Sequence, residues 1–144
     1  MRLPARTRAE SATAPYRNLI ERIRYEGAYP THERAEEITR TVLTALGSQL
    51  DDAARSELAA LLPPDAARLL CSAPPAEHPL TGWAFVKRLS EETGRSLAST
   101  RWDVGSVLTA VPHLVGPAVT DRAIASLPSG YALLFGRPQL VQAA

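Results

Sequence analysis

The side chains that most often bind metals are few in this chain and stand far apart. The histidines are His32, His78 and His113, and Cys71 is the only cysteine. A transition-metal site needs several such ligands at short spacing, or ligands that converge from different elements. The chain has no His-x-x-x-His, Glu-x-x-His or paired Cys spacing. We therefore expect no metal site.

Cys71 is poorly placed to act as a nucleophile. It follows two leucines at the expected end of a short apolar helix, whereas a reactive thiolate is stabilised at a helix N-terminus or beside a cation. Arg68 is the one nearby feature that favours reactivity. We expect Cys71 to be a small, buried apolar residue, and a single cysteine forms no internal disulfide.

The chain also lacks the common patterns of catalytic and nucleotide-binding sites. It has no Gly-x-Ser-x-Gly turn for a nucleophilic serine and no glycine-rich loop that would cradle phosphates. The adjacent carboxylates at 36–37 and 51–52 are explained by helix N-terminal charge and helix capping. We predict no catalytic residue, no cofactor and no enzymatic activity.

Trp102 is the residue whose position most indicates a function. At 100° per residue it lies about 160° around its helix from Val104, which belongs to the inward apolar stripe. The rest of its face consists of small residues, Gly105, Ser106 and Thr109. Two interpretations stay open. The ring anchors a contact with another protein or a second copy, or it is covered by the leader or by the tail at 140–141.

The elements that must position these residues occur twice along the chain. Four short sequences return in the same order: residues 19–23 as 85–89, 42–45 as 107–110, 62–63 as 127–128, and 69–70 as 134–135. The second of these is Val-Leu-Thr-Ala in both copies. The pattern predicts two similar helical units, at 15–71 and 81–136.

Apolar periodicity and capping signals predict three helices and a short fourth in each unit. In the first unit, Pro15 begins a helix that Gly27 ends, Thr31 caps the second, and Asp51 or Asp52 caps the third. In the second unit, helices start at Thr81, at Ser96 or Ser99, at 116–117 and at Tyr131, and Pro112 lies just past the second. Since no segment alternates like a strand, the predicted fold is all-α, with both units packed as one compact bundle-like domain at 15–136.

Three further segments complete the expected organisation. Residues 1–14 have the composition of a flexible basic leader, and residues 137–144 form a tail. Residues 72–80 contain three prolines and predict a semi-rigid connector between the units.

The arginines near the start of the chain are the basis of an alternative function. Residues 1–24 contain six arginines and two glutamates, although the net charge of the chain is only +1. The candidate basic contacts with phosphates are Arg6, Arg8, Arg17 and Arg24. Against this, the next expected helix begins with three glutamates at 33–37, which phosphates would repel. Nucleic-acid binding is therefore the less favoured alternative.

Composition favours a soluble cytoplasmic protein without a membrane partner. Hydrophobic residues make up 45% of the chain, but no apolar run approaches the ~20 residues that cross a bilayer. The first residues also lack the apolar stretch of a secretory signal.

The apolar spacings and Leu-Pro breaks are similar to those of one known family. The matching residues are Tyr16, Leu19, Ile23, Val42, Leu43, Leu46, Leu62, Pro63, Leu69, Leu70, Phe85, Val86, Val107, Leu108, Leu127, Pro128, Leu134 and Phe135. Over roughly 15–136, the chain resembles the family catalogued as domain of unknown function 2267. The resemblance implies a small bacterial all-helical protein without an assigned reaction, and it supplies no catalytic residues.

The sequence thus favours a non-enzymatic helical interaction or scaffold module that binds another protein or itself. Nucleic-acid binding through the arginine-rich leader and first helix is second. A small enzyme of unknown reaction is third.

Overall fold

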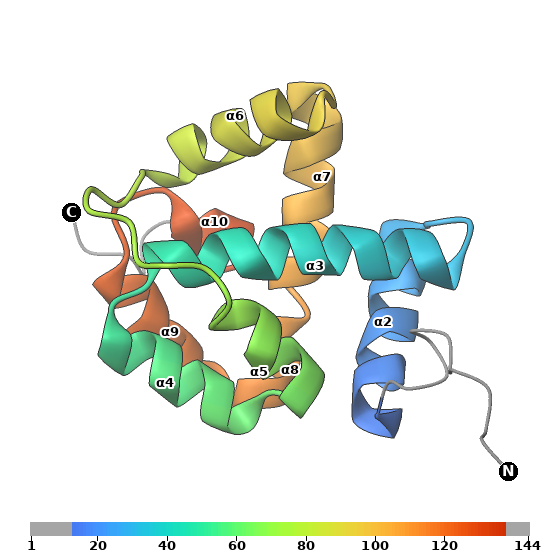
Figure 1. The fold of residues 1–144 in the computed structure, drawn as a ribbon, viewed down its shortest axis with the longest axis horizontal. Coiled ribbons are helices and arrows are strands. Elements are labelled where there is room, and N and C mark those ends of the chain that lie inside the picture. The colour runs from blue at the N-terminus through green and yellow to red at the C-terminus, as the bar shows by residue number, and fades with distance from the viewer. Residues whose placement is uncertain (1–12, 138–144) are drawn as a thin grey trace, which may run out of the picture.

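The computed structural model of the chain describes residues 13–137, and none of these lies in a strand, which confirms the all-α prediction (Figure 1). The first half consists of α2 (Ala14–Gly27), α3 (His32–Gln49), α4 (Asp52–Leu61) and α5 (Pro64–Leu70). The second half consists of α6 (Gly82–Thr93), α7 (Leu97–Leu108), α8 (Val111–Val115), α9 (Pro117–Ser126) and α10 (Tyr131–Leu134). No helix between residues 13 and 137 is long and apolar enough to cross a membrane.

Helices begin where side-chain oxygens can accept the unpaired backbone N–H groups of the first turn. Thr31, Asp51, Thr81 and Ser96 each accept from the backbone N–H three residues later, at 3.0, 2.8, 3.2 and 3.0 Å. The caps expected at Thr31 and Thr81 are therefore confirmed. Where the sequence left two candidates, the structure selects Asp51 and Ser96.

The short helix α8 was not predicted. Pro112 was expected just beyond the end of a helix, but it occupies the first turn of α8, where its missing N–H removes no helical hydrogen bond. His113 follows it in the same helix.

The long helix α3 runs through the middle of the molecule (Figure 1). It packs against α2, α5 and α7, while α4 packs against α9. The connector at 72–80 is tied to the end of α3, because Ala76 N donates to Ser48 O at 2.7 Å and Leu80 N donates to Gln49 Oε1 at 2.6 Å.

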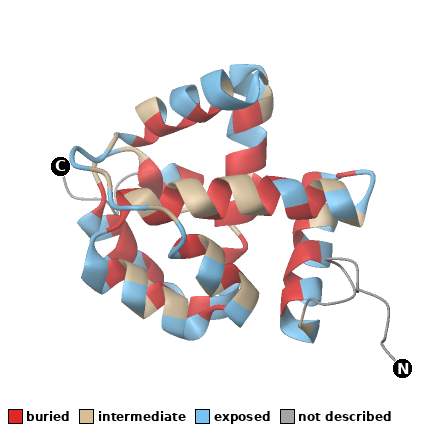
Figure 2. Cartoon of the chain, in the orientation of Figure 1, coloured by how far each residue is buried: buried red, intermediate tan, exposed pale blue. Residues whose placement is uncertain are grey.

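Both halves of the chain contribute to one buried hydrophobic cluster. It includes Ile20, Leu43 and Leu46 from the first half and Leu108 and Ile124 from the second. Figure 2 shows the inner faces of the helices in red, which marks these buried positions. The internal duplication and the boundaries of the two units stay predictions.

Helix α3 approaches α5 very closely at Gly47. A β-carbon at this position would overlap the backbone carbonyl of Leu70, so only glycine fits. The end of α5 therefore packs directly against the backbone of α3.

The shared core makes a prediction about stability. Leu43→Ala and Leu108→Ala each remove a fully buried side chain and should each lower the free energy of unfolding by about 2–5 kcal/mol. Calorimetry should show one cooperative transition for each variant. The exposed Leu61→Ala serves as a control and should change stability by less than about 0.5 kcal/mol. Two separable transitions would show that the halves fold independently.

Candidate functional site

Trp102 lies outside the hydrophobic core, and its side chain is 56% exposed. Its indole Nε1 nevertheless donates to the carbonyl oxygen of Gly27 at 2.9 Å, across 75 residues of sequence. Because Gly27 is the last residue of α2, this bond connects α7 to α2. Residues 1–12 of the leader and residues 140–141 of the tail, which were expected to cover the ring, lie outside the described residues. Its role in an interface stays a prediction.

Of the small residues predicted beside Trp102, Gly105 and Thr109 are partly exposed and Ser106 is not exposed. Ser106 is buried, and its Oγ donates to the carbonyl of Trp102 at 2.9 Å. Gly105 is overlaid by Arg101, whose Nη1 would lie 2.9 Å from a β-carbon there, and Thr109 packs near Gly136. The physical reason is that α7 contacts five other helices, namely α2, α3, α6, α8 and α10. These neighbours also cover positions outside its apolar stripe, so fewer residues of α7 are exposed than the stripe alone predicts.

An apolar groove instead lies between α6, α7 and α10, with a volume of about 420 Å³. We call it the Trp83 groove. Among its lining residues are Trp83, Val86, Leu97, Ala98, Arg101 and Leu133. Trp83, Leu97 and Leu133 are 67%, 49% and 53% exposed. Three large apolar side chains are therefore open to solvent around a single hollow.

A close approach of the backbone positions one end of this groove. The N–H of Gly82 donates to Ser129 O at 2.8 Å, and a β-carbon on Gly82 would lie 2.5 Å from the carbonyl atoms of Gly130. Gly130 has φ 99°, a left-handed conformation that favours glycine. These two glycines bring the start of α10 against the first turn of α6.

Aromatic packing fixes the same contact from the buried side. The rings of Phe85 and Tyr131 lie 5.5 Å apart between centroids, and Tyr131 Oη donates to Leu80 O at 2.9 Å. Burial holds the pKa of Tyr131 well above its ordinary value. Buried contacts thus lie beneath one end of the groove.

Two cations lie at the groove. Arg101 is the charged residue of its lining, and Lys87 Nζ lies 5.1 Å from the centroid of the Trp83 ring, a cation–π contact. Neither forms an ion pair with an acidic side chain in the described part of the chain.

The sequence analysis did not select Trp83, although a signal was available. Phe85, Val86 and Leu89 form the inward stripe of α6, and Trp83 lies about 200° around the helix from Phe85. Trp83 therefore points away from the inward stripe of its helix, as Trp102 does. The missed clue was that a second tryptophan stands off the stripe of its helix.

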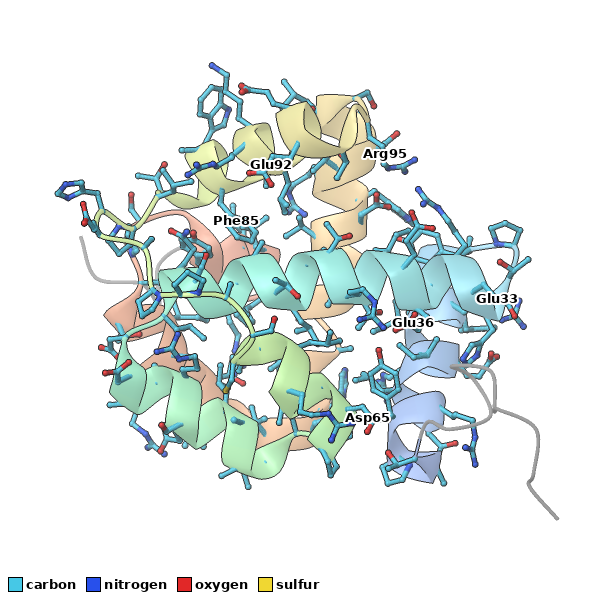
Figure 3. The ribbon with its side chains drawn as sticks, in the orientation of Figure 1. Glu33, Glu36, Asp65, Phe85, Glu92 and Arg95 are labelled. Atoms are coloured by element: carbon cyan, nitrogen blue, oxygen red, sulfur yellow. The ribbon has the colours of Figure 1, made fainter. Side chains whose placement is uncertain are left out.

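A larger hollow of about 1020 Å³ lies between α3, the connector and α6. Figure 3 shows Phe85 and Glu92 on the side of α6 that faces α3. Phe85 is buried, and Glu92 pairs with Arg88 at 3.2 Å. This hollow presents no exposed large apolar side chain, so we favour the Trp83 groove as the candidate site.

A smaller cavity of about 260 Å³ lies beside a buried polar network at the turn between α6 and α7, where Figure 3 places Arg95. Asp103 accepts from Tyr29 Oη at 2.8 Å and from Arg95 Nε at 2.7 Å. Burial, and then the bond to Asp103, raise the pKa of Tyr29, while a hydrogen bond with Ser106 opposes the rise. Both carboxylate oxygens of Asp103 are occupied, which is the arrangement of a structural ion pair.

The other residues considered from sequence do not gather into a site. Arg6 and Arg8 lie outside the described residues. Arg17 is exposed on α2, and Arg24 is half-buried with its Nε bonded to Glu21 at 3.1 Å. Within residues 13–137, no three His, Cys, Asp or Glu side chains are grouped closely enough to hold a metal ion.

The expected burial of Cys71 is wrong, because its side chain is exposed. It follows the last residue of α5 and stands where the chain leaves that helix for the connector, beyond the part of α5 that packs inward. The buried position of this segment is Leu70 instead.

These residues define an all-helical domain with a preformed apolar groove. Residues 16–134 match the family described as "Uncharacterized conserved protein (DUF2267)". The chain belongs to this family, which confirms the resemblance seen in its sequence. A comparison with curated proteins found no match.

The hydrogen bond of Trp102 makes a testable prediction. Trp102→Phe keeps an aromatic ring but leaves Gly27 O without this donor, so the free energy of unfolding should fall by about 0.5–1.5 kcal/mol. Trp83→Phe is the matched control, since Trp83 is similarly exposed and should change stability by less than about 0.5 kcal/mol. Equal denaturation midpoints for the two variants would contradict a stabilising role for the bond.

Proposed function

We propose that this protein is a non-enzymatic interaction module that binds an apolar segment of another protein, or of a second copy of itself, in the Trp83 groove. One observation carries the proposal: Trp83, Leu97 and Leu133 come from three different helices and expose their side chains around one hollow. Contiguous apolar surface of this kind marks interaction sites, because a monomer gains nothing from leaving it in water.

The groove has the composition of a binding surface. Tryptophan is among the residues that contribute most to protein association, and it does so from well-packed pockets that lose water on binding. Burial of apolar surface contributes about 25 cal/mol per Å². Of the three exposed apolar side chains at the groove, Trp83 is the most exposed at 67%, so it can bury the most apolar surface against a partner.

The contacts beneath the groove also favour binding. Its base is held by the Gly82–Gly130 contact and by the Phe85–Tyr131 ring pair. A preformed surface loses little conformational entropy when a ligand binds. Trp102 on α7 is exposed outside the groove lining, and we include it in the proposal as a second partner contact.

The buried ionisable groups support a structural and not a catalytic interior. Glu36 accepts from Tyr16 Oη and from Arg40 Nη2, both at 2.9 Å. Asp103 is bound in the same way by Tyr29 and Arg95. Each carboxylate therefore joins two segments of the fold through a tyrosine and pairs with an arginine, which is the arrangement of a structural contact.

The proposal predicts that Trp83→Ala separates binding from stability. The exposed ring contributes little to folding, so the unfolding midpoint should stay nearly unchanged, while affinity for an amphipathic leucine-rich helical peptide should fall by about 2 kcal/mol or more. Fluorescence anisotropy of the labelled peptide measures the affinity, and sedimentation of the chain alone measures self-association.

Tyr25→Ala on α2 is the matched control, because Tyr25 is 84% exposed and lies outside the groove. It should alter neither affinity nor self-association. If Trp83→Ala and Tyr25→Ala behave alike, the groove is not the binding site.

A further inference from the structure

We infer that the occupant of the Trp83 groove is an amphipathic helix of a different protein, with acidic residues along the edge of its apolar face. The inference depends on the proposed function and specifies the partner of the same site. It follows from the charge around the groove and from the backbone that lines it.

The side chains at the groove carry one sign of charge. Arg101 lines it and Lys87 lies over Trp83, and the groove lining contains no acidic residue. The acidic side chains of α6, at 91 and 92, belong to its last turn, at the end of the helix away from Trp83. Glu91 lies one helical turn after Lys87, but the lining itself contains Arg101 and no carboxylate, so the groove presents net positive charge to its occupant.

Two helix N-termini add to this positive potential. The first turn of α6 contributes Gly82 and Trp83 to the lining, and the first turn of α7 contributes Leu97 and Ala98. Neither first turn contains an acidic residue. Each helix N-terminus carries about half a positive charge, so both dipoles reinforce Arg101 and Lys87 and favour a negatively charged partner.

The groove suits a helix better than an extended strand. Its walls are the helices α6, α7 and α10, and no strand edge occurs among residues 13–137. A strand buried here would leave its N–H and C=O groups unpaired, which is costly. A helix satisfies its own backbone and can place apolar side chains at i, i+3, i+4 and i+7 into the hollow.

The same charges disfavour a second copy as the occupant. In a two-fold dimer identical surfaces face each other, so the Arg101 and Lys87 side chains of the two copies would be brought together around the buried Trp83 rings. Like charges juxtaposed at an interface oppose association. A partner with carboxylates at the flanks of its apolar face has the complementary charge.

Two synthetic peptides of about 15 residues test this, a length at which a helix can form. They share one leucine pattern at i, i+3, i+4 and i+7 and differ only in carrying glutamate or lysine beside the apolar face. Anisotropy titrations use the full chain at low ionic strength and again at about 1 M salt, where the Debye length is about 3 Å. The glutamate peptide should bind at least about tenfold more tightly at low salt, and the preference should disappear at high salt.

Arg101→Glu should reverse the preference between the peptides without loss of the fold, because the side chain is exposed. Arg22→Glu makes the same change in net charge on α2, where Arg22 is exposed and outside the groove, and should leave the preference intact.

The outcomes separate this inference from the proposed function. Equal affinity for both peptides, or equal effects of Arg101→Glu and Arg22→Glu, overturns the acidic partner but leaves the groove as a binding site, provided that Trp83→Ala still abolishes binding. Binding that does not depend on Trp83 overturns the proposed function itself. Concentration-dependent dimerisation that Trp83→Ala removes would identify a second copy as the occupant and contradict the inference.

Discussion

The contact between the first turn of α6 and the start of α10 is the constraint on which the candidate site depends. Helix α6 packs mainly against α7. Gly82 and Gly130 allow two backbones to meet, and the Phe85–Tyr131 pair holds them from the buried side. Because this contact turns the inward stripe of α6 toward the core, Trp83 on the opposite face is left in solvent. The exposed tryptophan is thus a consequence of how the helix is anchored.

Two buried carboxylates, those of Glu36 and Asp103, hold the two ends of α2 in place. Tyr16 at its start is bonded to Glu36 of α3, and Tyr29 just after its end is bonded to Asp103 of α7. Both phenols have a pKa raised above the ordinary value, chiefly by burial. A hydrogen bond to a charged acceptor in a buried site contributes more than one in water. Both buried carboxylates are therefore committed to bonds that position α2.

Much of the fold could be predicted from sequence because helix signals are local. The periodic apolar residues and the capping side chains of Thr31 and Thr81 act within a few residues of themselves. The errors arose where tertiary contacts decide the outcome. Ser106 is buried because neighbouring helices enclose α7, and Cys71 is exposed because α5 ends where the chain turns outward. The groove was missed for the same reason, since it exists only where residues from three helices meet.

The most direct test of the central claim is to map the bound glutamate-flanked peptide by NMR, following the backbone amide shifts of the chain during a titration. The account predicts that the largest shifts cluster in the first turns of α6 and α7 and in α10, around 82–87, 97–101 and 130–134. Shifts concentrated on α2, or along the hollow between α3 and the connector, would contradict it and would place the interaction surface elsewhere on the molecule.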